Sequence, residues 1–240
     1  SSIKTFGDTI HTFVEKQNYT GPFLPGYISS ISNKKNTDAG LIHIDHVVGN
    51  QHENKMLEVC EFYENIFGWH RFWTVDDKDI STDFTSLRSI VMANDNEIIK
   101  IPINEPAPGL KKSQIQEFID YYQDSGIQHM ALSTKDIIAT VKKMRENGVE
   151  FLNTPKSYYD NLSDRVGDID EDIETLSELG ILVDKDENGY MLQIFTSPIQ
   201  DRPTLFLEII QRKGSNSFGK GNFKALFESI EKEQEKRGNL

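Results

Sequence analysis

The chain has 240 residues, which is enough for one large domain or two small modules around a sizeable core. Its formal net charge is −12, and the acidic residues are spread along the chain without a basic patch. This pattern argues against nucleic acid or an anionic membrane surface as a partner, and the longest apolar runs are far below the roughly 18 residues of a membrane span.

Cys60 is the single cysteine, so no disulfide can form within the chain. Absence of disulfides fits the reducing cytosol, and we predict a cytoplasmic protein. Cys60 falls in an apolar helical stripe, which favours a small core residue over a reactive thiol.

The first forty residues carry few signals of regular structure. Residues 12–14 could form the end of a strand, but prolines and glycines then break any regular element between residues 21 and 26. We interpret residues 1–40 as the remnant of a further N-terminal domain with its linker, and residues 41–240 as the main domain.

An ordered pattern begins at residue 41. Met56, Val59, Cys60 and Tyr63 have helical spacing, and Gly68 is placed to end that helix. We predict a first module, residues 41–110, with a strand at 41–48, a helix at 53–67 and strands at 69–75, 87–93 and 97–103.

A second copy of this order follows a helix predicted at residues 113–123. An acidic, helix-prone excursion over residues 154–179 interrupts it. With the excursion set aside, we predict a second module, residues 127–212, with a strand at 127–133, a helix at 135–147 and strands at 149–152, 180–184, 190–196 and 204–210.

The two modules are a diverged internal repeat. I-D-H-V-V opens the first and I-Q-H-M-A opens the second, so His46 and His129 occupy the same place. Two β-α-β-β-β modules can pair their sheets into a half-closed barrel around a shared cavity. The predicted fold class is therefore α+β, with paired modules and a C-terminal helix over residues 220–237.

Glu208 lies in the middle of the apolar run T-L-F-L-E-I-I. A buried carboxylate is costly without a partner, so Glu208 needs either a lysine or arginine or a metal ion. Strand alternation places Phe206, Glu208 and Ile210 on one face.

Two histidines and one carboxylate from separate strands form the ligand set of a non-haem Fe(II) oxygenase, although Zn²⁺ accepts the same donors. A lone strand histidine is more often an ordinary core residue. Equivalent histidines in both modules, together with a strand-buried glutamate, favour His46, His129 and Glu208 as metal ligands.

His43 and Asp45 offer a competing set, because H-x-D with a distant histidine binds iron in a different oxygenase architecture. That architecture is a many-stranded jelly roll, whereas helices separate the strands here. We therefore rank His46 above His43 and Asp45, a choice that spacing alone would not make.

Several motifs together resemble the 4-hydroxyphenylpyruvate dioxygenase family over about residues 19–240. They are I-D-H-V-V-G-N, S-L-R-S-I-V, P-I-N-E-P, K-S-Q-I-Q, I-Q-H-M-A-L, L-Q-I-F-T, D-R-P-T-L-F-L-E-I-I-Q-R and F-G-K-G-N-F. The family has the vicinal-oxygen-chelate fold of paired β-α-β-β-β modules, and its members carry an additional N-terminal pair of modules without metal.

The resemblance implies that residues 41–240 are a catalytic domain in which His46, His129 and Glu208 bind Fe(II). It implies conversion of 4-hydroxyphenylpyruvate and O₂ to homogentisate and CO₂ in tyrosine catabolism. The implied partners are an aromatic 2-oxo acid and O₂, with a homodimer in the intact protein.

The resemblance also implies the residues of the substrate pocket. Neutral polar groups would orient the ring: Ser89, Asn104, Gln114 and Gln193. The remaining wall would be Val48, Gln128, Phe195, Phe206, Phe218, Asn222, Phe223 and Phe227. Core packing explains Phe195 equally well, and alternation points Gln128 to the strand face opposite His129.

Three alternatives stay open from the sequence. Hydroxymandelate synthase shares the fold, ligands and substrate but hydroxylates the benzylic carbon. An extradiol ring-cleaving dioxygenase uses a similar triad on a catechol. A non-enzymatic binding module of this fold would not bind iron.

The C-terminal helix has apolar residues at helical spacing, which are Phe223, Leu226, Phe227 and Ile230. Asn222 is suited to cap its start. The pattern alone favours a helix that covers the core. Glycines that permit a hinge precede it, at Gly214, Gly219 and Gly221, and the resemblance places Phe223 and Phe227 at the pocket mouth. We therefore predict that this helix is a lid over the pocket.

Overall fold

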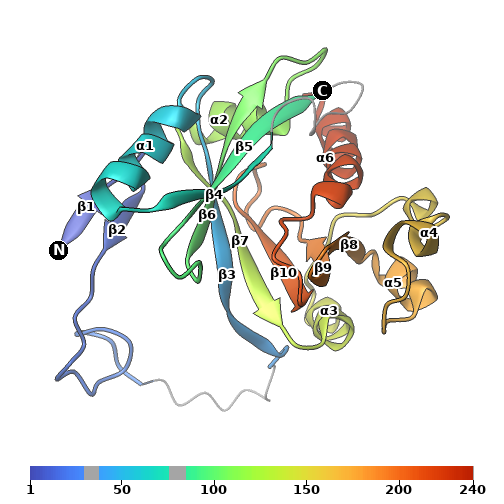
Figure 1. The fold of residues 1–240 in the computed structure, drawn as a ribbon, viewed down its shortest axis with the longest axis horizontal. Helices are drawn as coiled ribbons and strands as arrows, with labels where there is room; N and C mark the ends of the chain where they lie inside the picture. The colour runs from blue at the N-terminus through green and yellow to red at the C-terminus, as the bar shows by residue number, and fades with distance from the viewer. Residues whose placement is uncertain (30–37, 76–84, 240) are drawn as a thin grey trace.

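The computed structural model describes residues 1–29, 38–75 and 85–239 (Figure 1). Its centre is an eight-stranded sheet with the strand order β4-β5-β6-β3-β7-β10-β9-β8. The first half comprises β3 (Leu41–Asn50), α1 (Met56–Phe67), β4 (His70–Val75), β5 (Ser86–Ala93) and β6 (Lys100–Ala107). The second half comprises β7 (Gly126–Thr134), α3 (Ile137–Glu146), β8 (Leu182–Asp186), β9 (Gly189–Phe195) and β10 (Phe206–Lys213).

The strand pairing is the same in both halves. The first strand of each half pairs in parallel with the last strand of that half, β3 with β6 and β7 with β10. The two first strands then pair antiparallel at the middle of the sheet, with Val47 opposite Met130. Rotation about this pair exchanges the halves, which confirms the predicted fold class of paired β-α-β-β-β modules.

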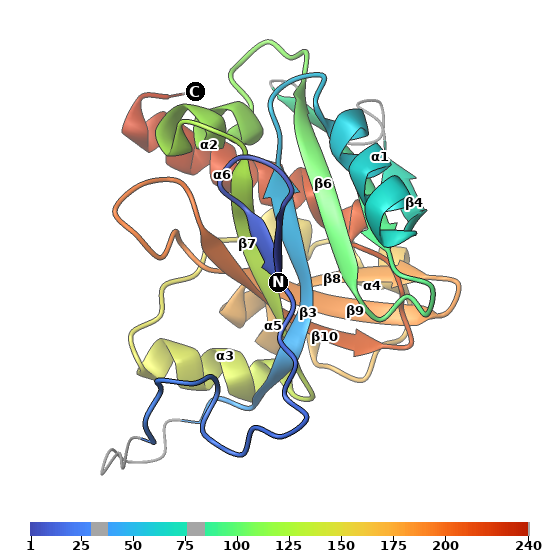
Figure 2. The same cartoon turned by 90° about the vertical axis from the view of Figure 1, so that its left-hand side faces the viewer.

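The helix inside each module packs on the outer face of the curled sheet (Figures 1 and 2). In α1, Met56, Val59, Cys60 and Tyr63 are buried because their spacing forms one apolar stripe. Gly68 ends α1 with a φ of 66°, the left-handed conformation that glycine adopts without strain. Cys60 is part of this core, as predicted.

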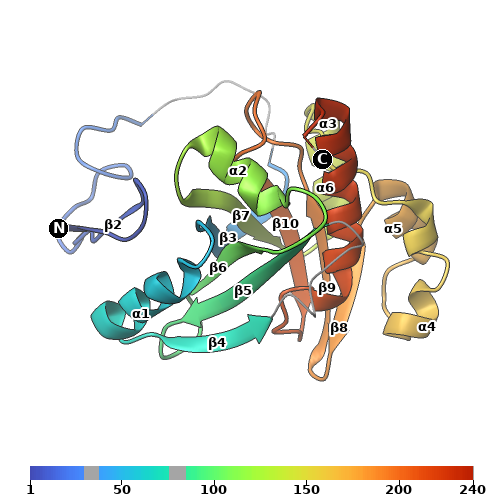
Figure 3. The same cartoon turned by 90° about the horizontal axis from the view of Figure 1, so that it is seen from above.

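Two further helices cover the open, inner side of the sheet (Figure 3). They are α2 (Gln114–Tyr122), capped by the Ser113 hydroxyl, and α6 (Phe223–Arg237). Leu226 of α6 packs with residues of β8 and β9, whereas Phe227 packs with Leu87 of β5 and Ile115 of α2. The C-terminal helix therefore bridges the two halves of the sheet.

The excursion within the second module folds into short helices, which are η1 (Lys156–Tyr158), α4 (Leu162–Val166) and α5 (Ile173–Leu179). Their apolar residues join the outer core of the second module beside α3. The strand predicted at residues 149–152 is reduced to a single bridge between Phe151 and Thr196, because the chain turns away immediately to enter the excursion.

The N-terminal residues form a small hairpin of β1 (Ser2–Lys4) and β2 (Ile10–Thr12). Phe6 at its turn packs against Gly49, where a Cβ atom would lie only 2.6 Å from the ring. Residues 30–37, part of the region interpreted from the sequence as a domain remnant with its linker, lie outside the described residues. Within the described part of the chain, no helix is long and apolar enough to cross a membrane.

Leu192 tests the outer core, because it is fully buried in the cluster that joins β9 to α3. We expect Leu192→Ala to lower the free energy of unfolding by about 2–5 kcal/mol through lost burial and the cavity left behind. Urea unfolding measures this. The matched control is Ile98→Ala, at a side chain that is 73% exposed, with an expected change within about 0.5 kcal/mol.

Candidate metal centre

Three side chains converge on the inner face of the sheet: His46 from β3, His129 from β7 and Glu208 from β10. The Nε2 atoms of both histidines lie 3.3 Å from Oε2 of Glu208. Each residue offers a ligand atom, and these atoms all lie within 4.8 Å of one another. All three residues are buried, so the group is isolated from bulk water.

The register on the central strand β7 produces this convergence. Ala131 pairs with His46 on one side and with Glu208 on the other. His129 lies two residues before Ala131 and therefore on the same strand face. Because Ala131 has only a methyl side chain, it leaves space between the three ligands.

The residue before each histidine fixes the imidazole. Nδ1 of His46 lies 2.8 Å from Oδ1 of Asp45, and Nδ1 of His129 lies 2.8 Å from Oε1 of Gln128. With Nδ1 engaged, Nε2 of each ring faces the centre. Gln128 was expected on the opposite strand face, but its side chain is long enough for the amide to reach His129.

The electrostatics of the group favour an ionised Glu208. Burial alone would raise its pKa, but the charge on His46 and the hydrogen bonds of both histidines lower the pKa to about 2. Burial lowers the pKa of His129. Burial acts in the same sense on His46, where the two carboxylates of Glu208 and Asp45 outweigh it and raise the pKa.

This donor set fits a divalent metal ion. Among the described residues, Glu208 forms ion pairs with the two histidines and with no lysine or arginine. The salt bridge to a lysine or arginine that the sequence left open is thus not formed in the described part of the chain. A cation bound by two imidazoles and a carboxylate would offset the desolvation of Glu208.

The repeat supplies only one such carboxylate. Val48 lies two residues after His46, as Ala131 lies two residues after His129. The parallel register places Pro102 of β6 beside Val48, just as it places Glu208 of β10 beside Ala131. Pro102 therefore occupies the position of Glu208 in the first module. The sheet frame is duplicated, but the carboxylate ligand is not.

The three candidate ligands line a small cavity with space for a few water molecules. Its walls are neutral or aromatic. Besides His46, His129 and Glu208, the lining residues are Val48, Trp73, Ser89, Val91, Pro102, Asn104, Gln193, Phe195, Phe218, Phe223 and Leu226.

Seven of the predicted pocket residues line this cavity: Val48, Ser89, Asn104, Gln193, Phe195, Phe218 and Phe223. Gln114, Gln128 and Phe206 instead line a neighbouring cavity, and the Phe206 ring stacks on His129 at 4.9 Å. Phe227 lies in an apolar cluster with Leu87 and Ile115.

The sequence interpretation missed Trp73, Val91, Pro102 and Leu226. Alternation along β5 from Ser89 could have found Val91, which points to the same face. No local pattern distinguishes Leu226 from the other apolar residues of α6, because its position depends on how that helix crosses the sheet.

Asn222 has a different role from the helix cap predicted for it. Its side chain makes no capping hydrogen bond to α6. Its amide donates to Oε1 of Gln193 at 3.0 Å, and the Gln193 amide in turn donates to Oε1 of Glu208 at 3.2 Å. A chain of neutral amides therefore connects the candidate ligand Glu208 to the start of α6.

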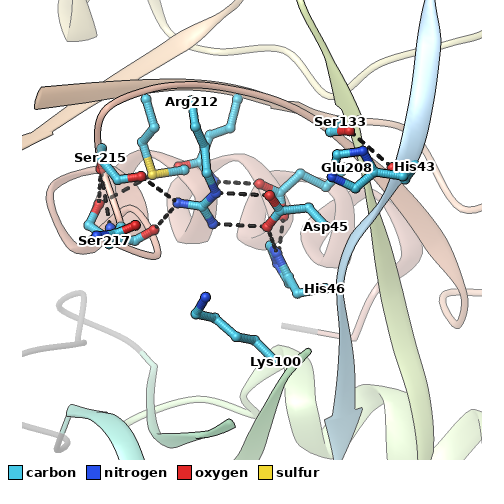
Figure 4. Close-up of polar contacts among 12 residues, drawn as sticks. His43, Asp45, His46, Lys100, Ser133, Glu208, Arg212, Ser215 and Ser217 are labelled. Atoms are coloured by element: carbon cyan, nitrogen blue, oxygen red, sulfur yellow. Dashed lines mark hydrogen bonds and ion pairs between the residues drawn. The ribbon is translucent and has the colours of Figure 1, made fainter. Parts of the chain in front are cut away.

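The competing ligand His43 lies outside this group. Its side chain is exposed, and its carbonyl oxygen accepts a hydrogen bond from Ser133 (Figure 4). Asp45 supports His46 through Nδ1, as described above, and is absent from the converging set.

Comparison with known proteins agrees with this fold and site. Residues 43–194 match the glyoxalase/bleomycin resistance protein/dioxygenase superfamily. The chain is 53% identical over 247 residues to a 4-hydroxyphenylpyruvate dioxygenase of Yarrowia lipolytica, covering 99% of this chain and 63% of the relative. It is 50% identical over 247 residues to that of Dictyostelium discoideum, covering 99% of this chain and 67% of the relative.

A solved structure is also similar. It is a variant of 4-hydroxymandelate synthase from Streptomyces coelicolor, with a TM-score of 0.72 and 35% identity over 80% of this chain and 54% of that one. The chain belongs to the glyoxalase/bleomycin resistance protein/dioxygenase superfamily and, within it, to the family of the 4-hydroxyphenylpyruvate dioxygenases. It spans about three fifths of the length of the curated relatives it matches.

Removal of one histidine tests the triad. We expect His46→Ala or His129→Ala to weaken binding of a divalent metal by at least about 100-fold, since two ligands remain of three. Metal titration by calorimetry measures this. His43→Ala is the matched control on the same strand and should bind metal as the unmodified protein does. Equal affinity in His129→Ala would contradict the assignment.

Proposed function

We propose that this chain is the metal-binding part of an Fe(II)-dependent dioxygenase that converts 4-hydroxyphenylpyruvate and O₂ to homogentisate and CO₂. The observation that carries the proposal is the buried group of His46, His129 and Glu208 at the end of a neutral, aromatic cavity. The names of relatives that are about 50% identical over nearly the whole chain support it.

Fe(II) is the metal in this proposal, held by His46 and His129 through Nε2 and by Glu208 through its carboxylate. When bound, the iron would supply the redox chemistry that activates O₂ and drives loss of CO₂ from the 2-oxo acid. The chain contributes a dry, shaped site with fixed ligands, and Asp45 and Gln128 hold the two imidazoles.

The cavity walls suggest how the substrate is held. Among the described lining residues there is no lysine or arginine to meet the 2-oxo acid carboxylate. That carboxylate would therefore bind at the metal, together with the keto oxygen. Trp73, Phe195 and Phe223 offer faces to the aromatic ring, and Ser89 and Asn104 offer hydrogen bonds to its hydroxyl.

Closure by the C-terminal segment is part of this proposal. Phe218, Phe223 and Leu226 line the cavity beside the candidate ligands. Phe227 and Leu226 also belong to apolar clusters, so most of α6 is core. We therefore assign the lid motion to residues 214–223, which include Gly219 with a φ of 76°.

Hydroxymandelate synthase is the second candidate, because a structure of that enzyme is 35% identical to this chain. It would use the same site and substrate but release 4-hydroxymandelate. An extradiol dioxygenase would instead take a catechol and need no 2-oxo acid.

Product analysis tests the proposed reaction. The protein is loaded anaerobically with Fe(II) and 4-hydroxyphenylpyruvate and then exposed to O₂. We expect homogentisate and CO₂ in equal amounts. Formation of 4-hydroxymandelate would select the second candidate, and turnover of a catechol without a 2-oxo acid would select ring cleavage.

Substrate binding should depend on the metal. Because no lysine or arginine lines the cavity in the described part of the chain, we expect metal-free protein to bind 4-hydroxyphenylpyruvate at least about tenfold more weakly than Fe(II)-loaded protein, a difference of about 1.4 kcal/mol. Anaerobic calorimetry measures both affinities. Equal affinity with and without metal would contradict chelation of the 2-oxo acid.

Substitution of Phe223 tests the lid, since its ring lines the cavity and its centroid lies 6.1 Å from that of the Trp73 ring. We expect Phe223→Ala to weaken substrate binding by about tenfold or more while lowering stability by less than about 2 kcal/mol. The control is Phe227→Ala, a core change expected to cost about 3–5 kcal/mol. A large stability loss in Phe223→Ala with unchanged binding would make this residue core instead.

A further inference from the structure

Arg212, near the end of β10, donates hydrogen bonds from all three of its side-chain nitrogens, to Asp45 on one side and to the loop that follows β10 on the other. Nε and Nη2 donate to the two carboxylate oxygens of Asp45, each at 2.9 Å. Nη1 donates to the backbone carbonyls of Ser217 at 2.6 Å and Ser215 at 3.3 Å (Figure 4). The planar fork of arginine suits such paired contacts, which lysine cannot reproduce.

The first direction leads to the metal centre. Asp45 uses Oδ1 both for Arg212 and for Nδ1 of His46, so the guanidinium fixes the carboxylate that fixes the imidazole. The side chains of Asp45 and Arg212 are only 13% and 21% exposed. Hydrogen bonds are stronger in such a partly desolvated setting than in water.

The second direction leads to the segment that covers the cavity. Ser215 and Ser217 belong to the loop of residues 214–219, which also carries Phe218. The guanidinium carbon of Arg212 lies 5.4 Å from the centroid of the Phe218 ring. The centroids of the Phe218 ring and the His46 imidazole are 5.1 Å apart. Arg212 thus contacts both Asp45 and Phe218, and each of these two residues contacts His46.

The repeat lacks a second copy of this arrangement. Gln128 takes the place of Asp45 beside His129, and an amide cannot supply the charge that Arg212 meets. Counting from the aligned Pro102 and Glu208, the register places Pro106 of β6 where Arg212 lies on β10. Proline has no side-chain donor, so among the described residues such an arginine contact to the loop exists on the His46 side of the site and has no counterpart on the His129 side.

We propose that Arg212 is a positioning residue that couples metal binding at His46 to closure of the loop 214–219 over the cavity. The inference rests on the proposed metal site. Because linkage is reciprocal, a metal that prefers the ordered His46 must also favour the closed loop, and loss of Arg212 must weaken both effects together.

The test uses the purified protein and Fe(II) alone, without O₂ or 2-oxo acid. Metal affinity is measured by competition with a chromophoric chelator. Loop closure is measured by the rate of trypsin cleavage after Lys220, an exposed residue directly after the loop. The variants are Arg212→Gln, Arg212→Lys and Asp45→Asn. The control is Arg71→Gln, which removes the ion pair between β4 and Glu64 of α1.

In the unmodified protein and in Arg71→Gln, Fe(II) should slow cleavage after Lys220. In Arg212→Gln and Asp45→Asn, we expect Fe(II) affinity to fall by about 10- to 100-fold and the protection at saturating Fe(II) to be lost. Arg212→Lys keeps the charge but not the paired geometry, so it should lose the protection while the melting temperature of the metal-free protein changes little. This last variant separates positioning from folding.

Two results would overturn the inference. One is unchanged Fe(II) affinity in Arg212→Lys and Arg212→Gln, and the other is full protection by Fe(II) in these variants. A separate result, no Fe(II) binding by the unmodified protein, would remove the proposed metal site itself and the inference with it.

Discussion

The register of three strands at Ala131 is the constraint on which the candidate site depends. Ala131 pairs with His46 and with Glu208, and His129 follows on the same face of the central strand. A shift of either neighbouring strand by one residue would turn a ligand to the opposite face of the sheet. The outer cores around α1 and α3 hold that register. The geometry of the three candidate ligands therefore depends on the packing of the two modules.

The duplicated modules build the sheet that encloses the cavity. The chemical character of the candidate site comes from positions at which the two modules carry different residues. His46 and His129 are equivalent, as are the strand faces that enclose the cavity. Glu208 has Pro102 as its counterpart, which leaves a single candidate carboxylate ligand beside the two histidines. Asp45 and Gln128 support the two imidazoles with different charge, so the two halves of the site differ in electrostatics even where their shapes agree.

The segment that covers the cavity is also joined to the metal centre by polar contacts. The amide of Asn222 reaches Gln193 and through it Glu208, whereas Arg212 connects Ser215 and Ser217 to Asp45 and His46. Gly219 is required within this network, because a Cβ atom there would lie 2.1 Å from Oε1 of Gln193. The candidate ligands and the segment that covers them are therefore parts of one partly buried polar network, and such a network is stable only when its members are satisfied together.

The sequence by itself determined the repeat and the fold class, because these follow from local periodicity. It also favoured His46, His129 and Glu208 as candidate ligands, from the equivalent places of the two histidines in the repeat and the cost of burying a carboxylate in an apolar strand. The resemblance to a known family supplied most of the cavity wall. Only the tertiary structure decided that Gln128 turns back to His129, that Asn222 serves Gln193 instead of capping α6, and that Arg212 joins Asp45 to the covering loop. Each of these contacts depends on the conformation of a long side chain or on residues far apart in the chain, 167 positions apart for Arg212 and Asp45, and strand or helix periodicity specifies neither.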